Sequence, residues 1–305
     1  MMADRATLHL LDRLPPLRGR VQADAPLGPT TWFRVGGPAE VLVRPADVAD
    51  LCAFLAKLPL DISVTTIGAA SNLIIRDGGV HGVVLRLVRG FTTIETDDDG
   101  VIAGAGALDV TVSEHAAAAG LGGLAFLCGI PGSIGGAVAM NAGAYGGDIA
   151  GCLDWVEIVT RDGELHQLTA GQIGFGYRHA SLPPEAVVVR ARLRGRLGDP
   201  KQIAADMADI RAAREASQPV RARTGGSTFR NPHDMKAWEL IDSVGGRGLM
   251  RGGAQVSEKH TNFLINTGTA TAADIEGLGE DLRRRVQAAS GIDLHWEIRR
   301  IGVPA

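Results

Sequence analysis

A cluster of arginines with a serine beside it is the sequence feature most suited to ligand chemistry. Residues 211–230 contain five arginines and one opposing carboxylate, Glu215, in a chain whose net charge is −3. Guanidinium groups bind phosphate oxygens through paired hydrogen bonds, and Ser227, which follows two glycines, can present its hydroxyl to a substrate. The pattern predicts a site for a phosphate-bearing ligand, although a solvated helix face followed by a turn has the same composition.

The glycine-rich run at residues 129–136, which reads GIPGSIGG, is a second candidate site. Missing side chains let backbone N–H groups approach an anion such as a pyrophosphate, while a buried turn between core elements is the alternative. The surrounding residues 116–147 carry no charge and are long enough to span a bilayer. Because they include ten glycines and Pro131, a continuous helix is disfavoured. We expect a loop that passes close to a ligand.

Three further side chains become informative only in combination. Arg178 follows an apolar stretch, Glu297 is the one carboxylate of a strand-like segment, and His260 precedes a predicted strand. Taken singly, each is more typical of a structural or surface position.

Several common site types are absent from the sequence. Its four lysines fit no Walker A loop, and neither GxGxxG nor GxSxG occurs, which disfavours P-loop NTPases, ordinary Rossmann dehydrogenases and α/β-hydrolases. Cys52, Cys128 and Cys152 lie far apart, and no HxxH or HExxH pair occurs. We therefore predict neither a disulfide framework nor a metal site. The small negative charge also argues against a nucleic-acid partner.

The elements that must position these groups indicate an α+β chain, whose 305 residues suggest about two domains. Apolar periodicity and capping residues predict helices at residues 48–58, 109–119, 201–217, 238–244 and 271–289. Apolar runs between glycine turns predict strands at residues 62–67, 72–75, 83–87, 153–160, 164–169, 186–193, 262–266 and 294–301, of which 153–169 form a hairpin. A boundary is predicted near residues 198–200.

Seven motifs, in order along residues 30–302, resemble those of the UDP-N-acetylenolpyruvoylglucosamine reductase family. The members of this family are flavoenzymes of peptidoglycan precursor synthesis. The seven motifs are TWFRVGGPA (31–39), GAASNLI (68–74), GIPGSIGG running on to NAGAYG (129–146), YR (177–178), GSTFRNP (226–232), VSEKH (256–260) and EIRRIG (297–302). Each motif is weak alone, and their shared order makes the resemblance specific.

The resemblance implies an α+β fold with two FAD-binding subdomains of the PCMH/vanillyl-alcohol-oxidase-like type, expected at residues 1–90 and 91–199. A C-terminal substrate domain is expected at 200–293, followed by a strand at 294–305 that returns to the active site. The missing GxGxxG agrees with this, because such FAD-binding folds lack that fingerprint. The implied reaction uses NADPH to reduce non-covalently bound FAD. Hydride then reaches C3 of the enolpyruvyl ether and a proton reaches C2, which gives UDP-N-acetylmuramate.

The resemblance also implies roles for individual residues. Ser227 matches the proton donor to C2, and Arg178 and Glu297 match the groups that stabilise the enolate. Glu297 would do so as a protonated donor or by orienting a neighbour. The implied substrate contacts are Tyr177, Arg221, Asn231 and His260. The implied FAD contacts are Gly68, Ala69, Ser71, Asn72, Leu73, Gly129, Ile130, Pro131, Gly132, Ser133, Gly135, Gly136 and Ala137.

The sequence departs from the family pattern at two places. Ala69 and Ala70 stand where the family more often has glycine or another small residue, and residues 179–181 are one residue longer than the common Tyr-Arg-x-Ser. No tyrosine-bearing insertion follows Leu182, which resembles the shorter subtype of the family.

The expected partner is the small molecule UDP-N-acetylglucosamine enolpyruvate, with no nucleic acid and no membrane. A monomer is expected, and residues 1–20 lack an apolar signal-peptide core, which predicts a cytoplasmic enzyme. One alternative is another FAD-dependent oxidoreductase of the same superfamily, which would be reoxidised rapidly by oxygen. The other is a non-catalytic nucleotide-binding protein, which would take up no flavin.

Overall fold

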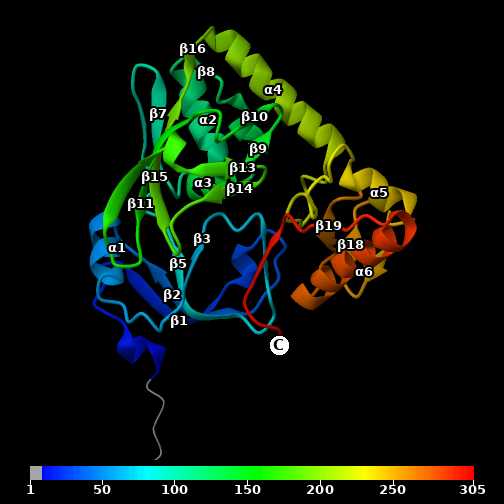
Figure 1. Ribbon diagram of the computed structural model, residues 1–305, viewed down its shortest axis with the longest axis horizontal. Coiled ribbons are helices and arrows are strands. Elements are labelled where there is room, and N and C mark those ends of the chain that lie inside the picture. Colours follow the sequence, from blue (N-terminus) through cyan, green and yellow to red (C-terminus); the bar gives the residue numbers. More distant parts are fainter. Residues whose placement is uncertain (1–8) are drawn as a thin grey trace, which may run out of the picture.

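The computed structural model describes residues 9–305, and its N-terminal part contains a four-stranded sheet with the order β1-β2-β5-β3 (Figure 1). β1 is antiparallel to β2, whereas β2 and β3 are both parallel to β5. Helix α1 (Val48–Leu55) begins where the Asp47 carboxylate accepts a hydrogen bond from the N–H of Asp50. The strands are β1 (Arg20–Pro26), β2 (Pro38–Arg44), β3 (Val64–Ile67) and β5 (Val80–Arg86), with 3₁₀ turns η1 (Leu10–Arg13) and η2 (Gly28–Thr30).

A second, fully antiparallel sheet has the order β12-β11-β15-β7-β6 and lies above the first in Figure 1. Its strands are β6 (Ile94–Thr96), β7 (Gly100–Gly104), β11 (Leu153–Val159), β12 (Leu165–Thr169) and β15 (Val187–Arg194). Helix α3 (Ile134–Met140) packs against β15, and α2 (Asp109–Ala118) packs against β7. The shorter elements of this region are β8 (Leu121–Gly122), η3 (Ala125–Gly129), β9 (Gly143–Ala144), β10 (Gly147–Asp148), η4 (Ala170–Gln172), β13 (Gly174–Gly176), β14 (His179–Ser181) and β16 (Arg196–Leu197).

The long helix α4 (Pro200–Ser217) leads from the second sheet to a C-terminal unit (Figure 1). In this unit α6 (Ala272–Ser290) packs on α5 (Ala237–Ser243) and on a three-stranded sheet. The strands are β17 (Met250–Arg251), β18 (Ala254–Val256) and β19 (Leu264–Asn266). The chain then turns back, because β20 (Arg299–Ile301) pairs in parallel with β4 (Leu73–Ile75) of the N-terminal part.

Two large apolar cores hold these parts together. One core joins both sheets and contains, among others, Phe54 of α1 and Val156 of β11. The other lies under α5 and α6 and also takes in Phe33 and Ile74 from the N-terminal part. Because that core contains side chains from both ends of the chain, burial of apolar surface fixes the C-terminal unit against the first sheet.

The structure confirms most of the predicted elements. Helices α1, α2, α4, α5 and α6 lie within one to three residues of their predicted bounds, and β11 and β12 form the predicted hairpin. Strands β3, β4, β5, β15 and β19 also fall in predicted strand segments. The division into residue ranges 1–90, 91–199, 200–293 and 294–305 stays a prediction, and residues 1–8 lie outside the described residues.

Three predictions about elements were wrong or incomplete. The loop expected over residues 129–136 ends at Ser133, because α3 begins at Ile134. Glycine is required at position 135 because a Cβ there would lie only 2.9 Å from the Cβ of Ala105. The strand expected at residues 294–301 covers only Arg299–Ile301. The sequence did not predict β1, β2, β6 and β7. β1 is mostly exposed, and β7 begins and ends with glycine. These strands are therefore stabilised by pairing with neighbouring strands more than by local propensity.

The uncharged residues 116–147 are divided among several short elements, as their glycine content predicts. Within the part of the chain that the structure describes, no helix is long and apolar enough to cross a membrane.

Candidate active site

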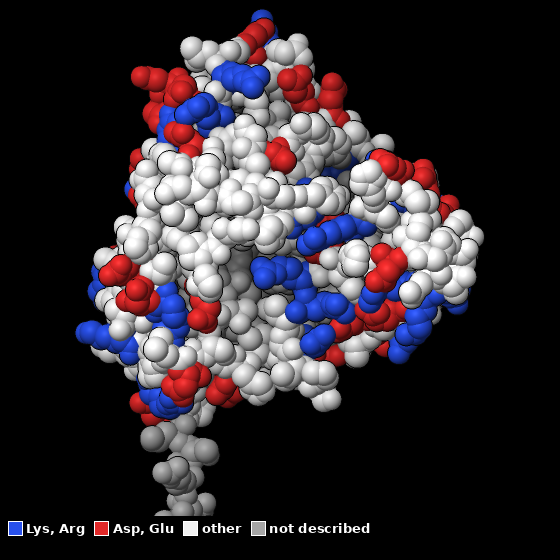
Figure 2. All heavy atoms as spheres, viewed as in Figure 1, with Lys and Arg blue, Asp and Glu red and all other residues white. Residues whose placement is uncertain are grey.

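A cleft of about 1080 Å³ is lined by the loop after β3, the glycine-rich loop, the residues around Arg178, and two segments of the C-terminal unit. Ligand pockets for drug-sized molecules reach roughly 1,000 Å³, so this cleft has room for a dinucleotide-sized ligand. Figure 2 shows a hollow in the middle of this face with Lys and Arg side chains gathered beside it. The cleft is lined by three carboxyl side chains, Asp109, Glu185 and Glu297, and by six arginines: Arg76, Arg178, Arg214, Arg230, Arg299 and Arg300.

Backbone hydrogen bonds bring Ser227 and Glu297 to the same wall of the cleft. The N–H of Glu297 donates to the carbonyl of Thr228 at 2.9 Å, and the N–H of Arg299 donates to the carbonyl of Asn72 at 3.1 Å. The Asn72 side-chain amide in turn donates to the carbonyl of Glu297 at 3.2 Å. The segment that carries Glu297 is thereby held between the Ser227 segment and the loop that follows β3.

Ser227 lines the cleft, and its hydroxyl makes no hydrogen bond within residues 9–305. A hydroxyl that the protein leaves unbonded can donate to, or accept from, a bound ligand.

Arg178 meets Glu297 across the cleft. Its Nε donates to Glu297 Oε1 at 2.8 Å, and both side chains are largely covered. Arg178 has a left-handed backbone with φ of 55°, and its carbonyl accepts a long hydrogen bond of 3.5 Å from Arg230 Nη2. The left-handed conformation costs a non-glycine residue about 1–2 kcal/mol, so the surrounding contacts hold Arg178 in a conformation that it would not adopt by itself.

Two opposing influences act on the ionisation of Glu297. Burial raises the pKa of this carboxyl, while the positive charges of Arg178 and Arg230 act in the opposite direction. Burial is the larger influence, so the pKa of Glu297 lies above its usual range.

Three backbone hydrogen bonds fix the glycine-rich loop against the residues before α2. The N–H of Asp109 donates to Gly132 at 3.2 Å, that of Ile134 to Ala107 at 3.0 Å, and that of Gly135 to Ala105 at 2.9 Å. The N–H groups of Ser133 and Gly136 have no protein partner within the described residues. They are available to an anionic ligand.

Small residues and an unpartnered hydroxyl shape the space between the two predicted cofactor loops. The Ser133 hydroxyl is buried without a partner in residues 9–305, and a Cβ on Gly68 would lie 2.5 Å from it. A Cβ on Gly136 would meet nothing within 4 Å, so open space lies there. Free N–H groups, a free hydroxyl and this absence of side chains are the features that a diphosphate requires.

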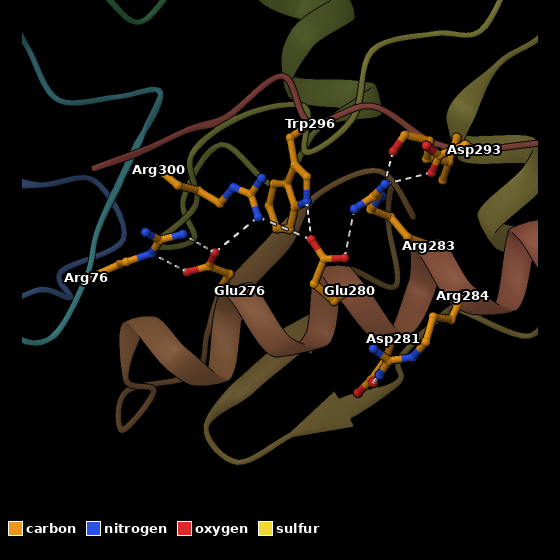
Figure 3. Close-up of polar contacts among 10 residues, drawn as sticks. Arg76, Glu276, Glu280, Asp281, Arg283, Arg284, Asp293, Trp296 and Arg300 are labelled. Atoms are coloured by element: carbon orange, nitrogen blue, oxygen red, sulfur yellow. Dashed lines mark hydrogen bonds and ion pairs between the residues drawn. The ribbon is translucent and has the colours of Figure 1, made fainter. Parts of the chain in front are cut away.

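An ion-pair network braces one wall of the cleft (Figure 3). Arg76 donates to both carboxylate oxygens of Glu276 at 2.8 and 3.0 Å, and Arg300 Nη1 reaches Glu276 at 3.1 Å and Glu280 at 3.2 Å. Trp296 Nε1 donates to Glu280 at 2.7 Å, and the Arg300 guanidinium lies 4.6 Å from the centre of the Trp296 ring. The network joins β4, α6 and β20 and fixes the residue next to Glu297.

The structure brings all three predicted catalytic residues and all thirteen predicted FAD contacts into this one cleft. Arg178, Ser227 and Glu297 line it, and so do both predicted cofactor loops at residues 68–73 and 129–137. Residues that are as much as 229 positions apart in the sequence therefore share one site, although their individual roles stay predictions.

None of the four predicted substrate contacts lies among the residues that line the cleft. Tyr177 is more than half exposed, and the side chain of Arg221 is 90 % exposed beside Glu215. The Asn231 side chain accepts the N–H of Ala237, which holds the start of α5.

His260 also lies away from the cleft wall. Its ring lies against Phe263 at 4.8 Å between ring centres, and burial lowers its pKa. Its assignment and those of Tyr177, Arg221 and Asn231 stay predictions.

Several residues of the cleft carry no distinctive signal in the sequence. Arg214 and Arg230 belong to the predicted basic segment, but only the fold shows that these two, rather than Arg221, face the cleft. Arg214 is half-buried, donates to Gln218 at 3.3 Å and has no carboxylate partner within residues 9–305. Asp109 carried no signal beyond an acidic residue at a helix start.

Two models of known protein families match this chain. Residues 39–169 match the model for the FAD binding domain family, and residues 218–301 match that for the UDP-N-acetylenolpyruvoylglucosamine reductase C-terminal domain. The fold is thus an α+β FAD-binding fold followed by a C-terminal domain.

Three proteins similar to this chain carry the same name. The UDP-N-acetylenolpyruvoylglucosamine reductase of Acidiphilium cryptum is 67% identical over 100% of this chain and 98% of its own length. That of Granulibacter bethesdensis is 66% identical over 96% of this chain and 94% of its own. The crystal structure of the Thermus caldophilus enzyme superposes with a TM-score of 0.81 at 36% identity, over 94% of this chain and all of that one.

Proposed function

This chain belongs to the UDP-N-acetylenolpyruvoylglucosamine reductase family, and we propose that it reduces UDP-N-acetylenolpyruvoylglucosamine to UDP-N-acetylmuramate with NADPH as the electron donor. The observation that carries this proposal is the meeting of Arg178, Glu297 and Ser227 in the cleft that both glycine-containing loops line. Such an enzyme would supply a precursor for peptidoglycan synthesis.

The cleft fits non-covalently held FAD. The loops at residues 68–73 and 129–137 would hold it, with the Ser133 hydroxyl and the N–H groups of Ser133 and Gly136 free for its diphosphate. FAD, when bound, supplies the hydride chemistry between NADPH and the enolpyruvyl group. The protein's part is to bind and orient the reactants and to manage charge and protons.

Arg178 would stabilise the negative charge that hydride addition places on the substrate. When hydride adds to C3 of the enolpyruvyl alkene, negative charge spreads from C2 into the carboxylate as an enolate. A fixed cation beside that charge lowers the barrier because it needs no reorganisation during the reaction. Glu297, as a carboxylate that accepts from Arg178 Nε at 2.8 Å, would hold the guanidinium in the required orientation.

Ser227 would deliver the proton to C2. Its hydroxyl is free of protein hydrogen bonds within the described residues and faces the cleft, and the neighbouring Thr228 carbonyl holds the Glu297 backbone close by. A serine hydroxyl is a weak acid, but an enolate carbon is basic enough to take its proton. A well-placed acid contributes about 10²–10⁴-fold to the rate.

Arginine side chains would hold the anionic parts of the substrate. Arg214 lines the cleft with no carboxylate partner in residues 9–305, so its charge is available to a diphosphate. The enzyme is proposed to work as a monomer in the cytoplasm, where nucleotide-linked sugars and NADPH are both present.

The visible absorption spectrum of the purified protein, with the released chromophore identified, tests the cofactor. Bound FAD that NADPH reduces, and that the enolpyruvyl nucleotide reoxidises faster than oxygen does, would support the complete proposal. Rapid reoxidation by oxygen without any response to the nucleotide would favour another oxidase with this fold. A protein that takes up no FAD would leave only a nucleotide-binding role.

A further inference from the structure

Asp109 is a buried acidic side chain with no hydrogen-bond partner. It is the first residue of α2, its relative exposure is 0%, and neither carboxyl oxygen meets a polar group within residues 9–305. Buried carboxyl groups are ordinarily hydrogen-bonded or paired, because an isolated charge in the interior is costly. The mechanism proposed above makes no use of Asp109.

The carboxyl of Asp109 lies directly behind the glycine-rich loop. A Cβ on Gly132 would be 2.5 Å from its Oδ2, and the Asp109 backbone N–H donates to the carbonyl of Gly132 at 3.2 Å. Asp109 is also among the residues that border the cleft, as is Ser133 with its own unpartnered hydroxyl. Two buried polar groups without protein partners in residues 9–305 therefore adjoin the part of the cleft that is suited to a diphosphate.

No opposite charge compensates Asp109. The elements packed against α2 carry Glu95 on β6, Cys128 on η3 and six charged side chains on α4, including Arg211 and Arg214. Arg211 is paired with Glu114 further along α2 at 2.7 Å. Burial alone raises the pKa of Asp109 well above its usual range, and none of these side chains shifts it. Burial therefore favours the neutral form of this carboxyl over the ionised form.

The charge on this carboxyl decides whether the loop can hold an anion. A neutral carboxyl supports the loop and offers an O–H donor, whereas an ionised one places a negative charge close to a doubly ionised diphosphate. In a water-poor interior that repulsion is much stronger than at the surface. Binding of such an anion and ionisation of Asp109 must then oppose each other.

We propose that Asp109 is a positioning residue of the cofactor cleft, whose neutral carboxyl supports the loop that holds the FAD diphosphate and whose ionisation releases FAD. This inference rests on the proposed function in its choice of ligand. It adds a pH-dependent control of cofactor retention through a residue that need not touch the reacting atoms.

The test measures FAD release from the purified holoprotein on dilution, by flavin fluorescence, from about pH 6 to about pH 9. If ionised Asp109 repels FAD, binding weakens by up to tenfold for each pH unit above the pKa that Asp109 has in the FAD-free protein. We expect the apparent dissociation constant of the wild type to rise at least tenfold across this range. The Asp109→Asn side chain has the same shape and cannot ionise. The FAD dissociation constant of this variant should therefore change less than about threefold over the same pH range.

Glu114→Gln is the matched control, because it removes an acidic charge from the same helix at an exposed position. It should keep the pH dependence of the wild type. Asp109→Ser carries the test if the asparagine variant does not fold. A wild type that retains FAD with a flat profile would overturn this inference alone, as would an Asp109→Asn profile as steep as that of the wild type. A wild type that holds no FAD at any pH would overturn the proposed cofactor as well.

Discussion

Arg178 donates a hydrogen bond from Nε to Oε1 of Glu297 at 2.8 Å, across 119 positions of the sequence. Arg178 comes from the turn between β13 and β14, whereas Glu297 comes from the segment before β20. The pair forms only because β20 returns from the C-terminal unit to pair with β4. The proposed charge-stabilising group therefore depends on two separate parts of the fold.

Glu297→Gln should slow reoxidation of the reduced flavin by the enolpyruvyl substrate by about 10²–10³-fold, since the charge that orients Arg178 is lost. In the wild type this rate should fall with decreasing pH as Glu297 takes up a proton. Because burial raises the pKa of Glu297, the fall should begin above the usual range of a glutamate, near 4.3. Stopped-flow rates across pH check both points. The reoxidation rate of the Glu297→Gln variant should not fall at acidic pH. A wild-type rate that rises as the pH is lowered would contradict the orienting role of Glu297.

Ser227→Ala should leave reduction of the flavin by NADPH unchanged and slow its reoxidation by substrate by about 10²–10⁴-fold, because the proton donor to C2 is missing. The two half-reactions are measured separately by stopped-flow absorbance. Ser217→Ala, at an exposed position of α4, is the control and should match the wild type in both. Equal losses in both half-reactions would show that Ser227 is not the proton donor.

Arg214→Ala should raise the KM for the UDP-linked substrate by roughly 10–100-fold with little change in kcat, the effect expected on losing a hydrogen bond to a charged group. Arg284→Ala is the control, because its side chain is 68% exposed and does not line the cleft. It should change KM less than about twofold, as most exposed charges do. An unchanged KM in the Arg214→Ala variant would show that Arg214 is not a substrate contact.

Glu276→Gln should lower the free energy of unfolding by about 1–3 kcal/mol near neutral pH, since Arg76 and Arg300 lose a shared carboxylate. The Arg76 hydrogen bond holds the pKa of Glu276 below its usual range, against the effect of burial. Because the pKa of Glu276 is lower in the folded protein than in the unfolded chain, its carboxylate stabilises the fold at pH values above the unfolded-state pKa of about 4.3. This stabilisation is lost as the pH falls through the pKa of Glu276 in the folded protein.

The difference in Tm between wild type and Glu276→Gln should therefore shrink below about pH 4, where the carboxylate is protonated in both states. Thermal unfolding followed by circular dichroism measures it. Glu215→Gln, at an exposed ion pair, should leave Tm unchanged. A difference that stays constant down to low pH would show that Glu276 stabilises by packing alone.

Ala70→Gly should raise the free energy of unfolding by up to about 1 kcal/mol, because Ala70 has a left-handed backbone with φ of 52°. Ala69→Gly, where φ is not positive, should lower it by about 0.5–1 kcal/mol. Denaturant unfolding of both variants gives the comparison. The same direction of change in both would mean that backbone strain at Ala70 does not matter.

Elements with strong local signals could be predicted from the sequence. The capped helices α1 and α6, the hairpin of β11 and β12, and the FAD-binding and C-terminal parts all follow from periodicity, capping and motif order. The family resemblance also implied Arg178, Ser227 and Glu297 as catalytic residues, because they match positions in the family's motifs. Strands such as β1 and β7 escaped prediction, since their conformation depends on partners from distant segments.

Which charged groups face the cleft could be learned only from the folded chain. Composition made Arg214, Arg221 and Arg230 equivalent, but packing turned Arg214 and Arg230 inward and left Arg221 in solvent. Burial behind Gly132 likewise raises the pKa of Asp109 above that of an ordinary aspartate at a helix start. The physical reason is the same in both cases: desolvation and charge pairing depend on neighbours in space, which the linear sequence does not specify.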